Sequence, residues 1–128
     1  MKLLNRSALS VKPTQEFVDW INSLEPTVGD DDLTLDDIDR ESTVYLIPEM
    51  DSPEALSAFV RERHREILES ELRAWEEDER QWPETHDWSL FQRFLRVEYS
   101  FLSVDLDDKT PLEIAEIDDV LLLDADQD

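Results

Sequence analysis

Residues 51 to 82 of this chain read D-S-P-E-A-L-S-A-F-V-R-E-R-H-R-E-I-L-E-S-E-L-R-A-W-E-E-D-E-R-Q-W. Ser52 is a favoured N-cap and Pro53 suits the first helical position, so we predict that a helix begins here. The chain's clearest stripe at three- and four-residue spacing follows, and we expect it to face the core: Leu56, Phe59, Val60, His64, Ile67, Leu68, Leu72 and Trp75. Because a proline disfavours helical backbone at the residue before it, Trp82 should lie just past the helix.

The opposite side of this predicted helix is charged, which indicates a solvated face. It carries Arg61, Glu62, Arg65, Glu66, Glu69, Arg73, Glu76 and Glu77. Three pairs of opposite charge lie four residues apart, and each is expected to contribute about 0.2–0.5 kcal/mol: Arg65 with Glu69, Glu69 with Arg73, and Arg73 with Glu77.

Three other segments are predicted strands. Ser7–Lys12 alternates between apolar and polar residues and is ended by a proline. Ser42–Glu49 is a nearly continuous apolar run, so we expect it to be central in the sheet, with both faces covered. Arg96–Leu106 alternates as far as Phe101–Leu102, where a change of apolar phase indicates a bulge or a crossing from an exposed edge to the core.

Shorter helices are predicted between these strands. One runs from Pro13 to Leu24 with Thr14 as a possible cap, a turn or two covers Thr34–Arg40, and another is capped by Asp87 or Ser89. The order β-α-β-α-α-β predicts an α+β fold with a small three-stranded sheet, helices packed mainly on one face and one long central helix. If the first two strands are sheet neighbours, a right-handed crossover joins them and they run parallel.

The chain has 128 residues, which predicts one domain. We expect residues 1–106 to form this single α+β domain and residues 107–128 to be an acidic, partly ordered C-terminal tail. In the tail, Thr110 and Glu113 have the spacing of a capping box. They predict a short helix with one apolar edge, formed by Leu112, Ile114, Ile117, Val120 and Leu121.

The charge of the chain is strongly unbalanced. It has 34 acidic and 12 basic residues, so its formal net charge is −22. Such a charge repels nucleic acid and anionic membranes and favours a partner with a basic surface. There is no cysteine, which excludes disulfides and thiolate zinc sites. Apolar runs of signal-peptide or membrane-spanning length are also missing, so we expect a cytoplasmic protein.

Catalytic motifs are missing too, and we expect no enzyme and no catalytic, cofactor or metal site. A single glycine rules out the usual phosphate-binding loops. His64 has no ligand partner at motif spacing, since Arg61 precedes it by three, and is interpreted as structural. His86 lies in a connector with no nucleophile tied to it. The acidic loop Asp30–Asp39 has no glycine where a calcium loop needs one, so weak divalent-cation binding is only the alternative to a solvated loop.

The acidity permits three interpretations of function. The first is a non-enzymatic acidic protein that acts through protein-protein contacts with a cationic partner. The second is a duplex-DNA mimic that occupies a nucleic-acid-binding protein, and the third is a salt-adapted housekeeping protein, for which three lysines against nine arginines would fit. Seven basic residues fall in the middle of the chain, between Arg61 and Arg96. The Arg-bearing long helix is therefore expected either to neutralise the protein's own acidic loop and tail or to form a homodimer.

Several segments together resemble a group of small acidic bacterial proteins that are uncharacterised. They are R-S-A-L-S-V-K-P at 6–13, F-V-D-W at 17–20, E-S-T-V-Y-L-I-P-E at 41–49, E-L-R-A-W at 71–75, W-P at 82–83 and F-Q-R-F at 91–94. The resemblance covers Asn5 to Leu106. Its motifs are apolar and structural, so it implies a shared fold and carries no functional residue to this chain.

Overall fold

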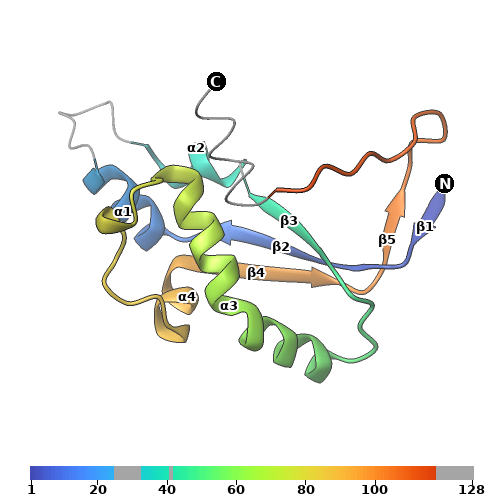
Figure 1. Cartoon of the computed structure of the whole chain (residues 1–128), viewed down its shortest axis with the longest axis horizontal. Coiled ribbons are helices and arrows are strands. Elements are labelled where there is room, and N and C mark those ends of the chain that lie inside the picture. Colours follow the sequence, from blue (N-terminus) through green and yellow to red (C-terminus); the bar gives the residue numbers. More distant parts are fainter. Residues whose placement is uncertain (25–32, 41, 118–128) are drawn as a thin grey trace.

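A computed structural model describes residues 1–24, 33–40 and 42–117, and it has an α+β fold. Three antiparallel strands form the main sheet in the order β3-β2-β4 (Figure 1). Strand β2 is Ser7–Pro13, β3 is Thr43–Ile47 and β4 is Leu95–Ser100. The predicted three-stranded sheet is confirmed.

Helices cover one face of this sheet. In β2, alternate residues from Ser7 to Pro13 are buried, with Leu9 and Val11 fully so, whereas Ser10 and Lys12 between them are only half-buried. This alternation is what a sheet with one face on the core produces. The core therefore lies between the sheet and the long helix that crosses it in Figure 1.

The long helix is α3, Pro53–Trp75, and it begins as predicted. Ser52 is its N-cap, and the Ser52 side chain accepts a hydrogen bond from the backbone N–H of Ala55. The expected side faces the core: Leu56, Val60, Ile67, Leu68 and Leu72 are buried, and Phe59 and Trp75 pack against them.

Helix α3 ends seven residues before Trp82, earlier than the proline alone predicts. The run E-E-D-E at 76–79 follows it directly. Carboxylates are unfavourable at the negative end of a helix dipole, which disfavours further helical turns. A 3-10 turn, Glu79–Gln81, comes next, and Trp82 is buried with its indole Nε1 donating to the Glu76 carbonyl at 2.7 Å.

Three shorter helices lie in the expected places. Helix α1 is Gln15–Leu24, α2 is Leu35–Asp39 and α4 is Trp88–Phe94. Asp87, one of the two predicted caps of α4, is the residue that caps it, through a hydrogen bond from the Leu90 N–H. The predicted loop at 26–32 lies outside the described residues.

Two predictions about the sheet are wrong. Strands β2 and β3 are antiparallel, not parallel, because the connection through α1 and α2 returns at the end of the sheet where β2 finishes, so that Val11 faces Thr43. Strand β3 is an outer strand, not the central one. The apolar run resembles that of a strand covered on both faces because Val44 and Leu46 are apolar. They nevertheless lie on the uncovered face of the sheet, where they are 62% and 55% exposed.

The predicted third strand is divided between two sheets. Strand β4 ends at Ser100, and β5, Ser103–Asp105, pairs instead with β1, Lys2–Leu4. Leu4 lies opposite Ser103 and Ala8 opposite Ser100, so three residues on one strand face two on the other. This extra residue is a bulge-like irregularity, and it accounts for the change of apolar phase predicted at Phe101–Leu102.

We call the projecting ribbon of residues 1–6 and 101–110 the arm. In Figure 1 it extends away from the main sheet beyond the start of β2. Residues 111–117 beyond it have no helix or strand, so the helix predicted from the capping box is wrong in this described part. Leu112, Ile114 and Ile117 are exposed there. Among the described residues, no helix is long and apolar enough to cross a membrane.

Candidate functional site

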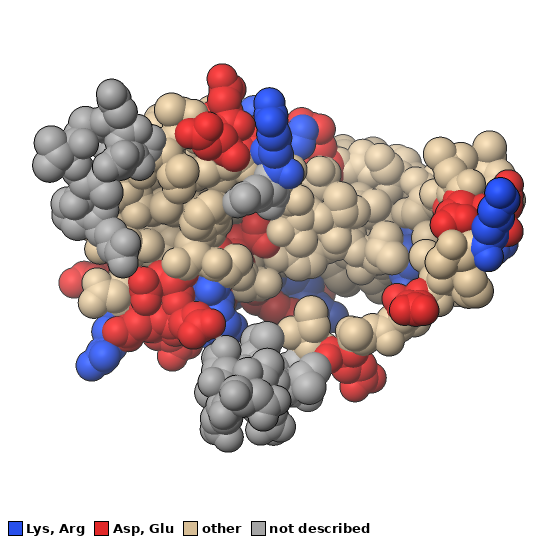
Figure 2. All heavy atoms as spheres, turned by 90° about the horizontal axis from the view of Figure 1, so that it is seen from above, with Lys and Arg blue, Asp and Glu red and all other residues tan. Residues whose placement is uncertain are grey.

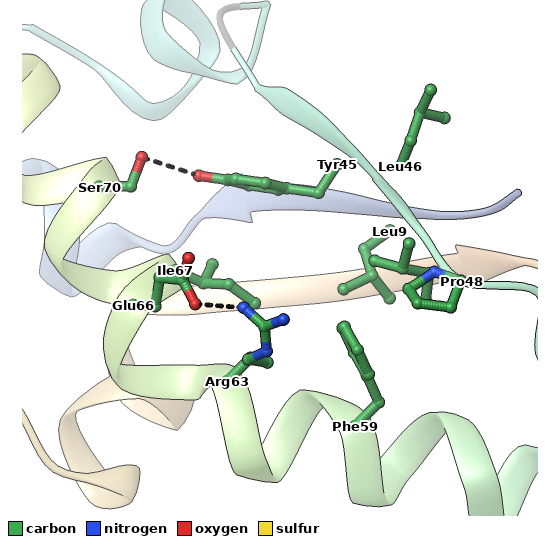
Figure 3. Close-up of a pocket in the computed structure, with 10 residues that line it drawn as sticks. Leu9, Tyr45, Leu46, Pro48, Phe59, Arg63, Glu66, Ile67 and Ser70 are labelled. Atoms are coloured by element: carbon green, nitrogen blue, oxygen red, sulfur yellow. Dashed lines mark hydrogen bonds and ion pairs between the residues drawn. The ribbon is translucent and has the colours of Figure 1, made fainter. Parts of the chain in front are cut away.

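A groove lies between the outer strand β3 and the helix α3 (Figure 3). It encloses about 250 Å³, and its apolar lining comes from Leu9, Ile47, Pro48, Phe59 and Ile67. Typical small-molecule sites measure about 300–1,000 Å³. The groove therefore suits one or two inserted side chains better than a whole cofactor.

Tyr45 forms one wall of the groove and ties β3 to α3. Its hydroxyl lies 2.6 Å from Glu71 Oε2 and 3.3 Å from Ser70 Oγ. Burial raises the pKa of Glu71, and hydrogen bonds from Tyr45 and Thr43 offset this only in part. Burial, together with the hydrogen bond to Glu71, also raises the pKa of Tyr45. The phenol therefore stays protonated and donates a hydrogen bond to the carboxylate.

Arg63 reaches into the groove from α3. Its Nη1 donates to Glu66 Oε2 at 2.6 Å, and its guanidinium carbon lies 5.4 Å from the centroid of the Phe59 ring (Figure 3). Both contacts are made within one helix face and both partners are partly exposed, so they cost little to rearrange. An incoming basic side chain can therefore compete with Arg63 for the carboxylate of Glu66.

The outer edge of β3 runs beside the groove. Within the described chain, β3 pairs with β2 alone, so its other edge offers unpaired backbone groups. Val44 and Leu46 stand on the face away from α3, while Tyr45 points to the groove. An added extended segment would thus meet backbone hydrogen-bonding groups, an apolar cavity on one side and exposed aliphatic side chains on the other.

His64 lies where the sequence placed it, on the border of the buried stripe. Its Nδ1 faces the Arg61 carbonyl oxygen, and its ring packs edge-on against Trp88 and Phe91, with centroids 5.3 and 6.0 Å away. Trp88 in turn stacks on Phe91 and lies under the Arg61 guanidinium at 4.6 Å. His64 is thus packed among aromatic and backbone groups, and its interpretation as a structural residue stays a prediction.

His86 is held between two acceptors. Its Nδ1 lies 3.1 Å from Glu69 Oε2 and its Nε2 lies 2.9 Å from the Pro83 carbonyl oxygen. Glu69 also accepts from Arg65 Nε at 3.1 Å, so the first of the three predicted charge pairs on α3 is present. In the described part of the chain, neither histidine is hydrogen-bonded to a serine or threonine hydroxyl.

The acidic loop is only partly described, because residues 30–32 are outside the described ranges. Asp37 closes a capping box with Thr34 at the start of α2. Hydrogen bonds from the Thr34 backbone and hydroxyl lower the pKa of Asp37. Among described residues no group of three or more histidine and carboxylate side chains is placed to hold a metal ion.

The groove was not predicted from the sequence. The sequence pattern predicts that Tyr45 lies in a strand covered on both faces, and it indicates no contact for Glu71. The available signal was the position of Glu71, one residue before Leu72 and therefore at the border of the apolar stripe, where a carboxylate needs a hydrogen-bond donor.

No family model, no curated protein and no solved structure matches this chain. The resemblance to small acidic bacterial proteins therefore stays a prediction.

Proposed function

We propose that this is a non-enzymatic binding protein that acts through contacts with a protein bearing a basic surface. The proposal also places it in the cytoplasm. The observation that carries it is the excess of carboxylates: with a formal net charge of −22, one-to-one pairing of every basic side chain leaves 22 acidic residues without a basic partner. A cationic protein would supply these counter-charges and would be steered to the surface by the long-range field.

Three arginines of α3 already pair with the protein's own carboxylates, so counter-charges for the remaining carboxylates would have to come from a partner. Arg63 pairs with Glu66 and Arg65 pairs with Glu69. Arg73 pairs with Glu79, at 3.3 Å. The arginines of α3 are thus used in part by carboxylates of α3 itself and of the turn that follows it. Figure 2 shows acidic side chains in several separate groups over the surface, with basic ones beside some of them.

We place the contact at the outer edge of β3 and the adjoining groove. A partner segment with alternating side chains would add a strand to β3 and insert apolar side chains above Phe59 and Ile67. Basic side chains of the segment would meet Glu66. Main-chain hydrogen bonds give such a contact its affinity, and the carboxylates give its preference for basic sequences.

A synthetic peptide of alternating valine and lysine is a suitable probe. We expect it to shift the backbone amide NMR signals of Thr43–Ile47 and to bind at least about tenfold more weakly in 0.3 M salt than in 0.05 M salt. The variant Leu46→Lys should abolish binding, and Leu3→Lys in the arm is the matched control that should retain it. Equal binding of an alternating valine–glutamate peptide would contradict the proposal.

The other interpretations predict different results. A duplex-DNA mimic would displace DNA from a nucleic-acid-binding protein and would not need β3. A salt-adapted protein would bind neither peptide and would lose stability when salt is removed. A homodimer through the arginines of α3 would dissociate in the variant Arg63→Glu.

A further inference from the structure

The outer face of the arm is apolar. Leu3 lies directly opposite Val104 in the pairing of β1 with β5, so the two side chains share a face. Leu3 is 70% exposed and Val104 is 45% exposed. Met1, Leu102 and Leu106, at alternating positions along the same two segments, are also exposed. Contiguous exposed apolar surface of this kind marks an interaction site in soluble proteins.

The arm has little support from the rest of the described chain. It consists of two strands of three residues each, paired with each other, and it projects from the main sheet (Figure 1). An isolated two-stranded ribbon is marginally stable in water, and stability needs further strands or a packed face. The face that carries Leu3 and Val104 is the one available for such packing.

The arm also differs from the rest of the chain in charge. Its basic side chains are Lys2, Arg6 and Lys109, and its acidic side chains are Asp105, Asp107 and Asp108. These formal charges cancel, although the whole chain has a formal net charge of −22. On the face shown in Figure 2, the arm at the right-hand end is mostly uncharged surface, with a mixed group of basic and acidic side chains at its tip. Two copies of this acidic chain can therefore approach through the arm with little repulsion.

We propose that the arm is a dimerisation element, in which the face carrying Leu3 and Val104 packs against the same face of a second copy. A two-fold axis makes such a contact self-complementary, because the same residues serve both sides. Two ribbons stacked face to face, about 10 Å apart, bury both apolar rows. Because each arm projects from its own body, the two acidic bodies stay apart.

This contact has a salt dependence opposite to that of a cationic partner. Salt screens the repulsion between two bodies of like charge, so the dimer should tighten as salt increases. A complex with a basic peptide should weaken instead. The two proposals can therefore be tested separately. Dimerisation through the arm can be found without peptide binding at β3, and peptide binding at β3 can be found without a dimer.

The test is sedimentation equilibrium of the full chain, at low and at high salt. We expect twice the monomer mass of 15.1 kDa, with a smaller dissociation constant at high salt. The double variant Leu3→Glu/Val104→Glu should raise the dissociation constant by about tenfold or more, because it would bury carboxylates. The matched control is Val44→Glu/Leu46→Glu, which changes two similarly exposed aliphatic residues on the main sheet and should still dimerise.

Crosslinking provides a second measurement that keeps the face apolar, because cysteine behaves as a small hydrophobic residue. The chain has no cysteine, so Val104→Cys carries a single thiol close to the proposed two-fold axis. Oxidation should link two copies rapidly, whereas Val44→Cys should link them slowly. A wild-type chain that stays monomeric at high salt and millimolar concentration would overturn the proposal. So would loss of the dimer in the Val44→Glu/Leu46→Glu control with the arm variant unaffected.

Discussion

The Ser7 hydroxyl donates a hydrogen bond to the carbonyl oxygen of Phe101, with 3.0 Å between Oγ and O. The same Oγ accepts from the backbone N–H of Met50, also at 3.0 Å. Ser7 is fully buried, and it is the first residue of β2. One side chain thus joins three segments at the point where the main sheet ends and the arm begins.

We predict that Ser7→Ala lowers the free energy of unfolding by about 1–3 kcal/mol. The substitution leaves the Met50 N–H and the Phe101 carbonyl without this partner at a partly buried site, and an unsatisfied polar group there costs up to about that much. Urea denaturation measures the change. Ser10→Ala, in the same strand but on the uncovered face, is the control and should change stability by about 0.5 kcal/mol or less. Equal effects of the two substitutions would contradict the linking role of Ser7.

Glu71→Gln is predicted to stabilise the protein near neutral pH. In the folded state burial raises the pKa of Glu71 above its usual 4.5. A raised carboxyl pKa means that the folded state binds the proton more tightly, so the contribution of Glu71 to stability is present at low pH and is lost as pH rises through the folded pKa. The glutamine variant lacks this loss and can still accept from Tyr45.

Thermal melts of both proteins from pH 4 upward would show the effect of Glu71→Gln as a gap that widens with pH. Glu62→Gln, at an exposed position of the same helix, provides the control. A variant that is less stable than wild type at every pH would show that the Tyr45 hydrogen bond requires the charged carboxylate.

Glu69→Gln is predicted to have the opposite effect, although it lies only two residues away. Burial raises the pKa of Glu69, but the hydrogen bonds and charges of Arg65 and His86 outweigh it, so the pKa is lowered overall. A lowered carboxyl pKa adds stability at pH values above the usual pKa of 4.5. This added stability is lost as the pH falls through the folded pKa. The variant should therefore be less stable at pH 7 by about 1 kcal/mol. The difference should shrink as melts are repeated at lower pH; a gap that is constant down to pH 2 would refute this account.

Truncation after Leu106 tests the expected division between domain and tail. It removes nine acidic residues and one lysine, so the formal net charge changes from −22 to −14. We expect the core to remain folded and its melting temperature to depend less on salt, because self-repulsion is smaller. Circular dichroism and melts at two salt concentrations measure both. Unchanged salt dependence, or an unfolded core, would show that the tail is not a separate acidic segment.

The fold class and the long helix were predictable because their signals are local. Ser52 and Pro53 define a helix start through groups that lie within one turn, and the stripe from Leu56 to Trp75 follows from helical periodicity. Strand direction was not predictable, because it depends on where the connection through α1 and α2 returns. The exposed Val44 and Leu46 also gave an outer strand the apolar pattern of a central one.

The groove was less predictable than the fold. It requires Tyr45 and Glu71, which are 26 residues apart in the chain, to meet across β3 and α3. Sequence periodicity assigns each residue to a side of its own element but not to a partner on another. The interpretation of the two histidines rests on missing motif partners and stays a prediction.

One additional residue separates the arm from the body: three residues, Asn5 to Ser7, stand opposite two, Phe101 and Leu102. With equal numbers on both sides, the two ladders could merge into one long uninterrupted ribbon. Loss of Asn5 alone, a single codon, would then straighten the molecule and change the direction in which Leu3 and Val104 point. The number of residues in this segment, more than their identity, therefore determines the direction in which the arm exposes Leu3 and Val104.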